Sequence, residues 1–393
     1  MAFGLVLGCG VSQASARDAF EGLFTVDGQT RAASSTEAEG FINLFTDAGL
    51  RSLFANYTPV SAATAAVSLR GVPATLSYDP GSTTLRLVVP GAAIDESFTG
   101  LTRDESQDLA LEWLKGRGGA AVTRLLQQAV ATTPIDPVAG NPNSLMSQMG
   151  ASDFGAATGA LPGGRFGLGA RFGQYSAEGY DTNTWTVPLG YAFELESGPT
   201  IILDGPLTLV DAGGSQSYSG SLGLGVRVPV RLGLSGVAWS LTPMLRIGGV
   251  GSTALGAVGA IWSASLTSTL DLRLGQATNL VIGNMFSHMQ TLPLSVGDYD
   301  VSYDLRNQMF RNGAILSHDI GEWFGLPMKG SVFLIDTRFT GDALFVESYQ
   351  EFGGYVSFGL RAGGREVPLS LGVTMLNGEQ GYRGFSLNLG MTF

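Results

Sequence analysis

The sequence predicts a mainly β fold: a transmembrane antiparallel β-barrel of about 12 strands behind a small N-terminal α+β segment. Three observations lead to this prediction. Of the 393 residues only 14% are charged, and 57 are glycine. In the second half of the chain, large apolar residues alternate with small or polar ones. The alternation continues through the last residue, Phe393.

Composition favours a membrane protein over a soluble one. Soluble domains average about 25% charged residues, whereas this chain has 14% and a mean hydropathy of +0.20. Beyond the N-terminus, no apolar run reaches the roughly 18 residues that a helical span needs. Because backbone in lipid must satisfy its own hydrogen bonds, a closed barrel is the remaining spanning structure. The net charge of −11 argues against nucleic acid as a partner.

Residues 1–16 are interpreted as a signal peptide. An apolar run is followed by Ala14 and Ala16, the small residues that a signal peptidase needs. The basic residues that usually open such a peptide are missing, which fits a true start upstream of Met1. Two alternatives stay open: a buried N-terminus that is retained, or lipidation of Cys9, since residues 6–9 resemble a lipoprotein cleavage box. Cys9 is the only cysteine, so a mature chain without it would hold no disulfide or thiolate metal site.

Residues 17–155 are expected to form the N-terminal α+β segment. A first helix is predicted from residue 36, with Gly49 as its end, and two more over about 103–115 and 120–131, because apolar residues recur there at helical spacing. Two of these helices open on capping boxes, namely Thr36 with Glu39 and Thr102 with Glu105. Residues 136–143, which are rich in proline and glycine, are interpreted as a linker.

Strand signals complete this segment. A hairpin is predicted at 74–78 and 84–89, because Pro80 and Gly81 between them supply turn conformations. With 22–26 as a further strand, the order strand, two helices, two strands resembles the small periplasmic transport-associated domains that precede some barrels. The alternatives are another kind of small α+β domain or a plug for the barrel.

Residues 156–393 are predicted to form the barrel. Large apolar residues on one face and Gly, Ser, Thr or Arg on the other are typical of strands with lipid outside and a polar lumen. The apolar members are Phe166, Leu168, Ala170 and Phe172; Trp185, Val187, Leu189, Tyr191 and Phe193; Leu222, Leu224, Val226, Val228 and Val230; and their counterparts in 239–247, 333–339, 352–360 and 367–375.

The same alternation places charged residues in the lumen. They are Arg165, Arg171, Arg227, Arg246, Arg273, Arg338 and Arg361, with Glu194, Asp271 and Asp336 as the acids. Rings of inward charge select the sign of the ions that a pore admits. The alternative is an arginine network that braces a filled barrel and admits no solute.

The last strand carries the most specific pattern. Phe385, Leu387, Leu389, Met391 and Phe393 alternate with small or polar residues up to the terminus. The pattern resembles the C-terminal assembly signal of bacterial outer-membrane barrels. The resemblance implies insertion by the barrel assembly machinery, contact with outer-membrane lipid, and location in the outer membrane of a Gram-negative bacterium.

In size and layout the barrel region also resembles the roughly twelve-stranded translocator barrel of autotransporters. In that family a helix-bearing segment lies just upstream of the barrel. The departure is that residues 17–155 contain none of the long β-helical repeats usual in autotransporter passengers.

Residues that could carry chemistry are few. The two histidines, His288 and His318, each follow a serine. Because neighbours along a strand point to opposite faces, neither Ser-His pair can act as a dyad by itself. No metal-ligand spacing, nucleotide-binding motif, cofactor or catalytic residue is predicted.

The leading hypothesis is therefore a passive pore, or a translocator or anchor of autotransporter-like type. The alternative is a structural or adhesive surface protein that uses the barrel only as an anchor. A barrel lipid hydrolase is less favoured, since His288 or His318 would have to approach a serine hydroxyl across strands. We further consider that the helix at 103–115 or at 120–131 restricts the barrel mouth, against the competing picture in which both pack on the hairpin.

Overall fold

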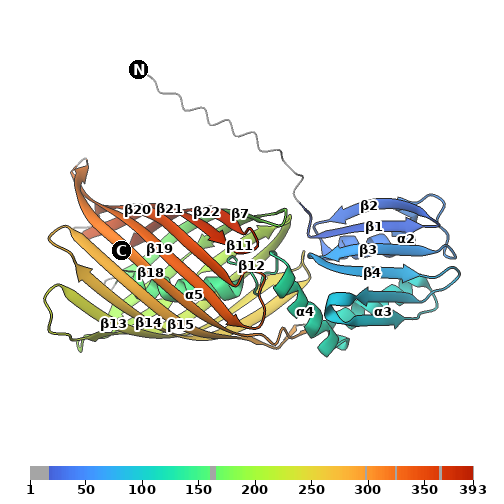
Figure 1. The fold of residues 1–393 in the computed structure, drawn as a ribbon, viewed down its shortest axis with the longest axis horizontal. Coiled ribbons are helices and arrows are strands. Elements are labelled where there is room, and N and C mark those ends of the chain that lie inside the picture. The colour runs from blue at the N-terminus through green and yellow to red at the C-terminus, as the bar shows by residue number, and fades with distance from the viewer. Residues whose placement is uncertain (1–16, 160–164, 297–298, 324, 363–364, 393) are drawn as a thin grey trace, which may run out of the picture.

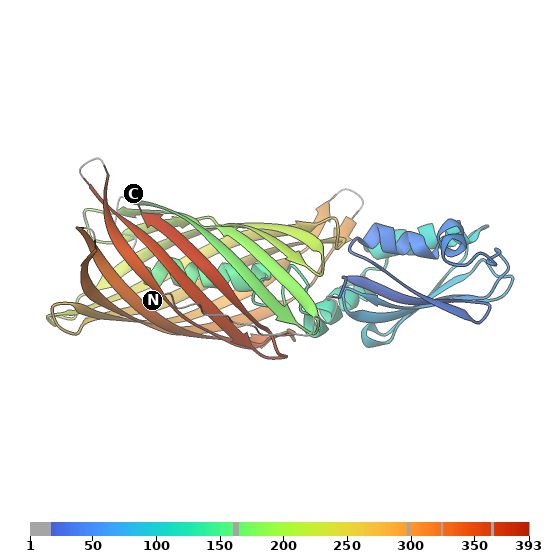
Figure 2. The same cartoon turned by 90° about the horizontal axis from the view of Figure 1, so that it is seen from above.

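The computed structural model describes residues 17–159, 165–296, 299–323, 325–362 and 365–392. An N-terminal domain with a six-stranded sheet lies end to end with a long closed barrel, and one helix lies inside the barrel (Figures 1 and 2). Within the described part of the chain, no helix is long and apolar enough to cross a membrane.

The N-terminal sheet is antiparallel, in the order β2-β1-β3-β4-β5-β6. Its strands are β1 (Phe20–Val26), β2 (Gln29–Ser35), β3 (Ala63–Leu69), β4 (Val72–Tyr78), β5 (Leu85–Val89) and β6 (Ile94–Phe98). The helical elements are α1 (Ala38–Ile42), η1 (Asn43–Phe45), α2 (Asp47–Leu53), η2 (Pro90–Ala92), α3 (Arg103–Glu112), η3 (Trp113–Arg117) and α4 (Ala120–Thr132). Helices cover one face of the sheet (Figure 2).

The core of this domain lies between the sheet and α1–α3. Phe24 packs there against Phe41 and Phe45, and Phe45 stacks on Tyr78. Arg103, at the start of α3, is buried with its guanidinium 4.6 Å from the centre of the Tyr78 ring. Its Nη2 donates to the carbonyl of Ser61 at 2.7 Å, so α3 is fixed to the sheet and lies away from the barrel lumen.

Several local predictions are confirmed and two are wrong. The hairpin forms as β4 and β5, and Thr102 caps α3 by accepting from the Glu105 N–H at 3.1 Å. The Thr36 capping box does not form, and the first helix is broken at Thr46, which caps α2. Gly49 lies inside α2 and does not end a helix; a Cβ there would meet the Asn43 carbonyl oxygen at 2.1 Å, so the position requires glycine.

The predicted order of elements was also wrong. Two strands precede the first helices and four strands follow them, so the order behind the resemblance to transport-associated domains is not present. Strands β2, β3 and β6 were not predicted. Their short runs of Thr, Ala and Ser, or of Asp and Glu, carry little apolar alternation, because their outer side faces solvent.

The barrel sheet contains fourteen strand segments, of which β8 with β9 and β10 with β11 each form one interrupted strand, giving twelve. The segments are β7 (Arg165–Ala177), β8 (Tyr180–Val187), β9 (Leu189–Glu194), β10 (Thr200–Asp204), β11 (Leu207–Ala212), β12 (Ser215–Val230), β13 (Val237–Ser252), β14 (Ala257–Arg273), β15 (Thr278–Leu292), β18 (Arg306–Trp323), β19 (Leu326–Gly341), β20 (Ser348–Ala362), β21 (Arg365–Gly378) and β22 (Arg383–Thr392). Strand β22 pairs with β7 and closes the barrel. A small hairpin of β16 (Leu294–Val296) and β17 (Tyr299–Val301) lies between β15 and β18.

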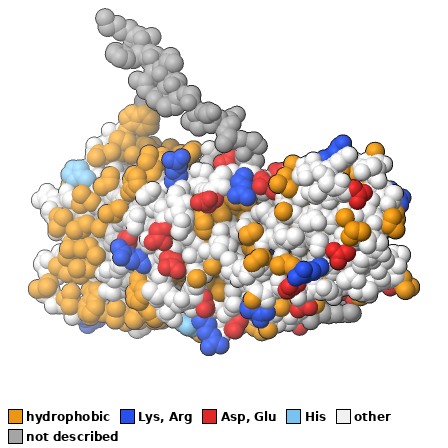
Figure 3. Space-filling view, turned by 45° about the vertical axis from the view of Figure 1, so that its right-hand side comes forward, with side chains coloured by type: hydrophobic (Ala, Val, Ile, Leu, Met, Phe, Trp, Pro, Cys, Tyr) orange, Lys and Arg blue, Asp and Glu red, His pale blue; other side chains and the backbone are white. Residues whose placement is uncertain are grey.

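The outer surface of the barrel carries a broad apolar belt, seen as the dense hydrophobic colouring in Figure 3. Leu224 and Leu245 are 52% and 63% exposed, while Gly223, Met244 and Arg246 between or beside them are buried. This is the alternation predicted for strands with lipid outside. Phe385, Leu387 and Leu389 of the last strand also point outward, whereas Phe393 lies outside the described residues.

Strand β19 has the opposite orientation from the prediction. Thr337 is fully buried, so its neighbours Asp336 and Arg338 lie on the outer face, not in the lumen. Phe339 faces inward instead and packs near Phe345 and Val346 at the barrel mouth. Apolar residues on both faces of β19 misled the prediction, because the lumen here is filled rather than wet.

The segment predicted as a linker, 136–143, also differs from the prediction. Residues 133–144 are buried throughout, and they lead into α5 (Leu145–Thr158), which the sequence did not predict. The predicted boundary at 155/156 falls inside α5. This helix lies in the lumen, along the barrel (Figures 1 and 2).

Candidate functional site: the filled barrel lumen

Helix α5 is threaded through the lumen in one direction. Its first residue, Leu145, lies beside Gly248, near the end of β13 that faces the N-terminal domain. Its last residue, Thr158, lies beside Gly283, where a Cβ would come within 2.5 Å of the Thr158 Cγ2. Small residues on the helix and glycines on the wall therefore allow a whole helix to fit inside twelve strands.

Arg246 joins α5 to the wall. Its Nε donates to Asp153 of α5 at 2.7 Å, and both side chains are fully buried. The same guanidinium pairs with Asp204 of β10, and Asp153 also accepts from the Ser265 hydroxyl at 2.8 Å. Buried charges are tolerated only when they are paired and hydrogen-bonded, so this cluster holds the helix at one depth.

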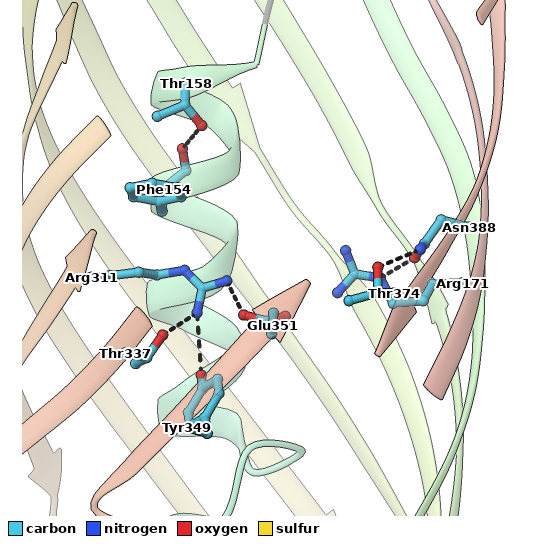
Figure 4. Close-up of polar contacts among 9 residues, drawn as sticks. All are labelled: Phe154, Thr158, Arg171, Arg311, Thr337, Tyr349, Glu351, Thr374 and Asn388. Atoms are coloured by element: carbon cyan, nitrogen blue, oxygen red, sulfur yellow. Dashed lines mark hydrogen bonds and ion pairs between the residues drawn. The ribbon is translucent and has the colours of Figure 1, made fainter. Parts of the chain in front are cut away.

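A second arginine, Arg311 of β18, lies against α5 at Phe154 (Figure 4). Its guanidinium is 5.4 Å from the centre of the Phe154 ring of α5. On the wall it pairs with Glu351 and donates to the Thr337 hydroxyl at 2.5 Å and the Tyr349 hydroxyl at 3.4 Å. Phe154 thus packs against a guanidinium that is already paired with the Glu351 carboxylate of the wall.

Arg227 holds the C-terminal end of α5. Its Nη2 donates to the carbonyl oxygens of Ala156, Ala157 and Gly159 at 2.8, 3.3 and 3.0 Å. The last carbonyls of a helix have no partner within the helix and carry partial negative charge. A cation at this position therefore both satisfies them and stabilises the helix end.

The barrel mouth next to the N-terminal domain is closed by residues 133–144. Asp136, fully buried, accepts from the N–H groups of Val138 and Ala139 at 2.9 and 3.3 Å. It also accepts from the Tyr303 hydroxyl of the barrel at 3.3 Å and lies 3.5 Å from the guanidinium of Arg70 in the domain. Burial raises the pKa of the Asp136 carboxyl, although Arg70 and the two N–H groups act to lower it. One carboxyl therefore connects domain, closing segment and barrel.

Helix α4 lies against the same mouth. The Val130 carbonyl accepts from the Phe345 N–H at 2.9 Å, and Gln127 donates to the Tyr303 carbonyl at 3.1 Å. Of the two helices considered for the barrel mouth, the one at 120–131 lies against it, whereas the one at 103–115 packs on the N-terminal sheet. The element that fills the lumen itself is α5.

Beside α5, from Asn143 before its start to Gly159 after its end, a cavity of about 1290 Å³ remains. It is lined by α5 and by wall residues of mixed charge, including Arg171, Asp204, Arg227, Asp271 and Glu351. Arg171 donates to Asn388 at 2.7 Å, and Asn388 donates to Thr374 at 2.9 Å (Figure 4). This cavity lies on one side of α5, whose other side packs on the barrel wall.

The structure separates the predicted lumen residues into four groups. The first group faces the lumen and comprises Arg171, Arg227, Arg246 and Asp271. The second group, Arg273 and Glu194, is exposed at the rim, and the third group, Asp336 and Arg338, lies on the outer face. The side chains of Arg165 and Arg361 lie outside the described part. Of the four inward residues, Arg227 and Arg246 bind α5 directly. The alternative of an arginine network that braces a filled barrel describes these contacts better than a ring of pore charges.

Sequence reasoning missed three lumen groups: Asp153, Arg311 and Glu351. Asp153 is the only acidic residue of α5. An isolated acid in an otherwise uncharged helix indicates a partner of opposite charge, because a buried carboxylate has to be paired. Arg311 and Glu351 belong to strands where polar residues occur on both faces, so alternation alone could not assign them.

The histidines do not form the arrangement that a hydrolase would require. His318 lies on the outer face, and its Nδ1 is 2.8 Å from the Thr278 hydroxyl. His288 packs edge-on against Trp262, with ring centres 5.6 Å apart. Among the described residues, neither histidine contacts a serine hydroxyl, and no cluster of His, Cys, Asp and Glu could hold a metal ion.

Fold and lumen together define a closed, twelve-stranded antiparallel barrel with an internal helix. No protein-family model and no curated protein matches this chain. The chain is similar to solved barrels, among them the translocator domain of autotransporter NalP from Neisseria meningitidis (10% identity, 63% of this chain and 95% of that one, TM-score 0.44). Others are the COG4313 outer membrane channel from Pseudomonas putida F1 (13%, 59% and 96%, 0.41) and LpxR from Salmonella typhimurium (11%, 58% and 99%, 0.38). Translocators and channels share this class of barrel, so the function has to be argued from the lumen.

Proposed function

We propose that the chain is an outer-membrane translocator and anchor of autotransporter-like type, which holds its N-terminal domain on the outer surface. The observation that carries the proposal is the threading of α5. The helix leads from the domain at one rim, through the lumen, to the other rim, where the barrel begins at Arg165. A chain with this path has its upstream domain on the side opposite to the barrel termini.

The loops suggest which rim faces outward. Gly167 pairs with Thr392, so both ends of the barrel lie at the same rim. In bacterial barrels the turns on the periplasmic side are short and the outer loops are longer. The longest connection between barrel strands, 293–305, lies at the other rim, and the domain contacts that rim through Gly213 and Ala254. The domain is therefore assigned to the outer surface and the barrel termini to the periplasm.

An anchor fits the lumen better than an open pore. Residues 133–144 fill the mouth, and α5 is held by Arg227, Arg246 and Arg311. The passive pore remains the second candidate, because the cavity of about 1290 Å³ beside α5 would widen into a passage if the helix left. The outward apolar pattern of the last strand supports insertion by the barrel assembly machinery.

Epitope tags test the proposed orientation. One tag is inserted between Pro80 and Gly81, in the exposed turn of the domain hairpin, and a second between Gly233 and Leu234, in an exposed turn at the rim of the barrel termini. Antibody should label the first tag on intact cells and the second only after the outer membrane is permeabilised. A first tag hidden on intact cells, with the second accessible, would reverse the orientation and overturn the proposal.

A further inference from the structure

A row of polar side chains crosses the outer face of the barrel. Asn284 of β15, Asn312 of β18, Asp336 of β19 and Gln350 of β20 are register partners from strand to strand. Arg338 lies two residues from Asp336 on the same face. We call these five residues the polar row.

The polar row interrupts the apolar belt. Asn284 lies between Ile282 and Phe286 on its strand, and Asn312 lies between Phe310 and Ala314. Phe286 and Phe310 are exposed, and so are Leu334 and Phe352 on the next two strands. In a membrane-inserted barrel, the two asparagines would therefore face hydrocarbon, not headgroups.

Polar groups in hydrocarbon are costly unless they are hydrogen-bonded. The side chains of Asn284 and Asn312 share one bond of 2.8 Å, and among the described residues neither makes another. A side-chain amide can donate two hydrogen bonds and accept two. Among the described residues, the side-chain NH₂ group of Asn312 and the side-chain oxygen of Asn284 are therefore left without partners. At the other end, Asp336 accepts from Gln350 and Arg338, both at 2.9 Å.

We infer that the polar row is the contact surface for a second copy of this chain, in a two-fold dimer within the membrane. In a two-fold interface the same patch meets itself, so each residue type must be complementary to another in the same patch. The row has this property. Amides donate to and accept from amides, and Arg338 of one copy can pair with Asp336 of the other. The inference assumes the membrane insertion of the proposed function but not its orientation.

Cysteine cross-linking tests the contact. In a Cys9→Ser background, Asn312→Cys places a thiol in the middle of the row, and Leu203→Cys places one on the outer face of β10, on the other side of the ring of strands. Oxidation in outer-membrane vesicles should give a disulfide-linked dimer for Asn312→Cys and none for Leu203→Cys. Heat-modifiable migration shows separately that each variant is folded and inserted. Folded Asn312→Cys that stays monomeric, or cross-links to a different protein, overturns the dimer.

Charge exchange supplies an independent test. Asp336→Arg and Arg338→Asp should each lose the dimer, since like charges then face each other across the two-fold axis. When the two variants are produced together, a mixed dimer should return, because an arginine pair then faces an aspartate pair. A dimer that survives both single changes overturns this interface. Failure of the folded variants to reach the outer membrane would count against the proposed function instead.

Discussion

At the scale of single residues, arginine connects the lumen helix to the wall. Arg246 is the clearest case, because its removal would leave Asp153 and Asp204 buried without a cation. Breaking a buried ion pair by deleting one partner costs about 3–5 kcal/mol. We therefore expect Arg246→Ala to lower the free energy of unfolding by this amount, measured by urea unfolding of the protein in lipid vesicles.

Arg171→Ala is the matched control for that prediction. Arg171 also faces the lumen, but its hydrogen bond goes to Asn388 on the wall, and the side chain is exposed. Losing an exposed contact of this kind costs about 1 kcal/mol or less. Equal losses for the two variants would mean that Arg246 does not hold α5.

At the scale of elements, alternation predicted the strand faces wherever one side meets lipid and the other is small or polar. It failed on β19, where Phe339 faces a filled mouth and Arg338 faces outward. It also failed for α5, for a related reason. Helix α5 packs on the wall with one side and faces the cavity with the other, and the buried side carries Asp153 beside Met146 and Met149, so no single apolar stripe stands out in its sequence. The strands that enclose α5 lie far from it along the chain, so no local sequence pattern indicates that this helix is enclosed.

Conductance tests whether α5 closes the barrel. A truncation that begins at residue 133 keeps α5, whereas one that begins at residue 159 removes it. In planar bilayers the first should stay closed and the second should conduct. Anions should be favoured, because Arg227 loses its carbonyl partners and Arg246 loses Asp153. A closed barrel after both truncations would show that α5 is not the plug.

At the scale of the whole molecule, the domain and barrel meet in one buried joint. Arg70 comes from the domain, Asp136 from the closing segment and Tyr303 from a barrel loop. Backbone contacts surround this joint, such as the Ala38 N–H with the Ala254 carbonyl at 2.8 Å. Because Asp136 is the shared partner, its loss should free the closing segment rather than unfold either part.

Proteolysis of residues 133–144 measures this effect. Asp136→Leu leaves the N–H groups of Val138 and Ala139 buried without an acceptor, at about 1–3 kcal/mol for each unsatisfied group. A protease should then cut the segment and release the domain. Asp136→Asn keeps an acceptor oxygen and resembles the protonated carboxyl, so it should stay resistant. Asp95→Ala, which breaks only the exposed pair with Arg86, should also stay resistant.

The same joint predicts a pH dependence. Since burial raises the folded-state pKa of Asp136, its stabilising contribution is complete at a pH below the ordinary aspartate value. That contribution is lost as the pH rises through the raised pKa, because the buried carboxyl then becomes charged. The wild-type segment should therefore be cut faster as the pH rises from acidic toward neutral, after correction for the protease's own pH profile. In Asp136→Asn this dependence should disappear, and a dependence that persists there would assign it to another group.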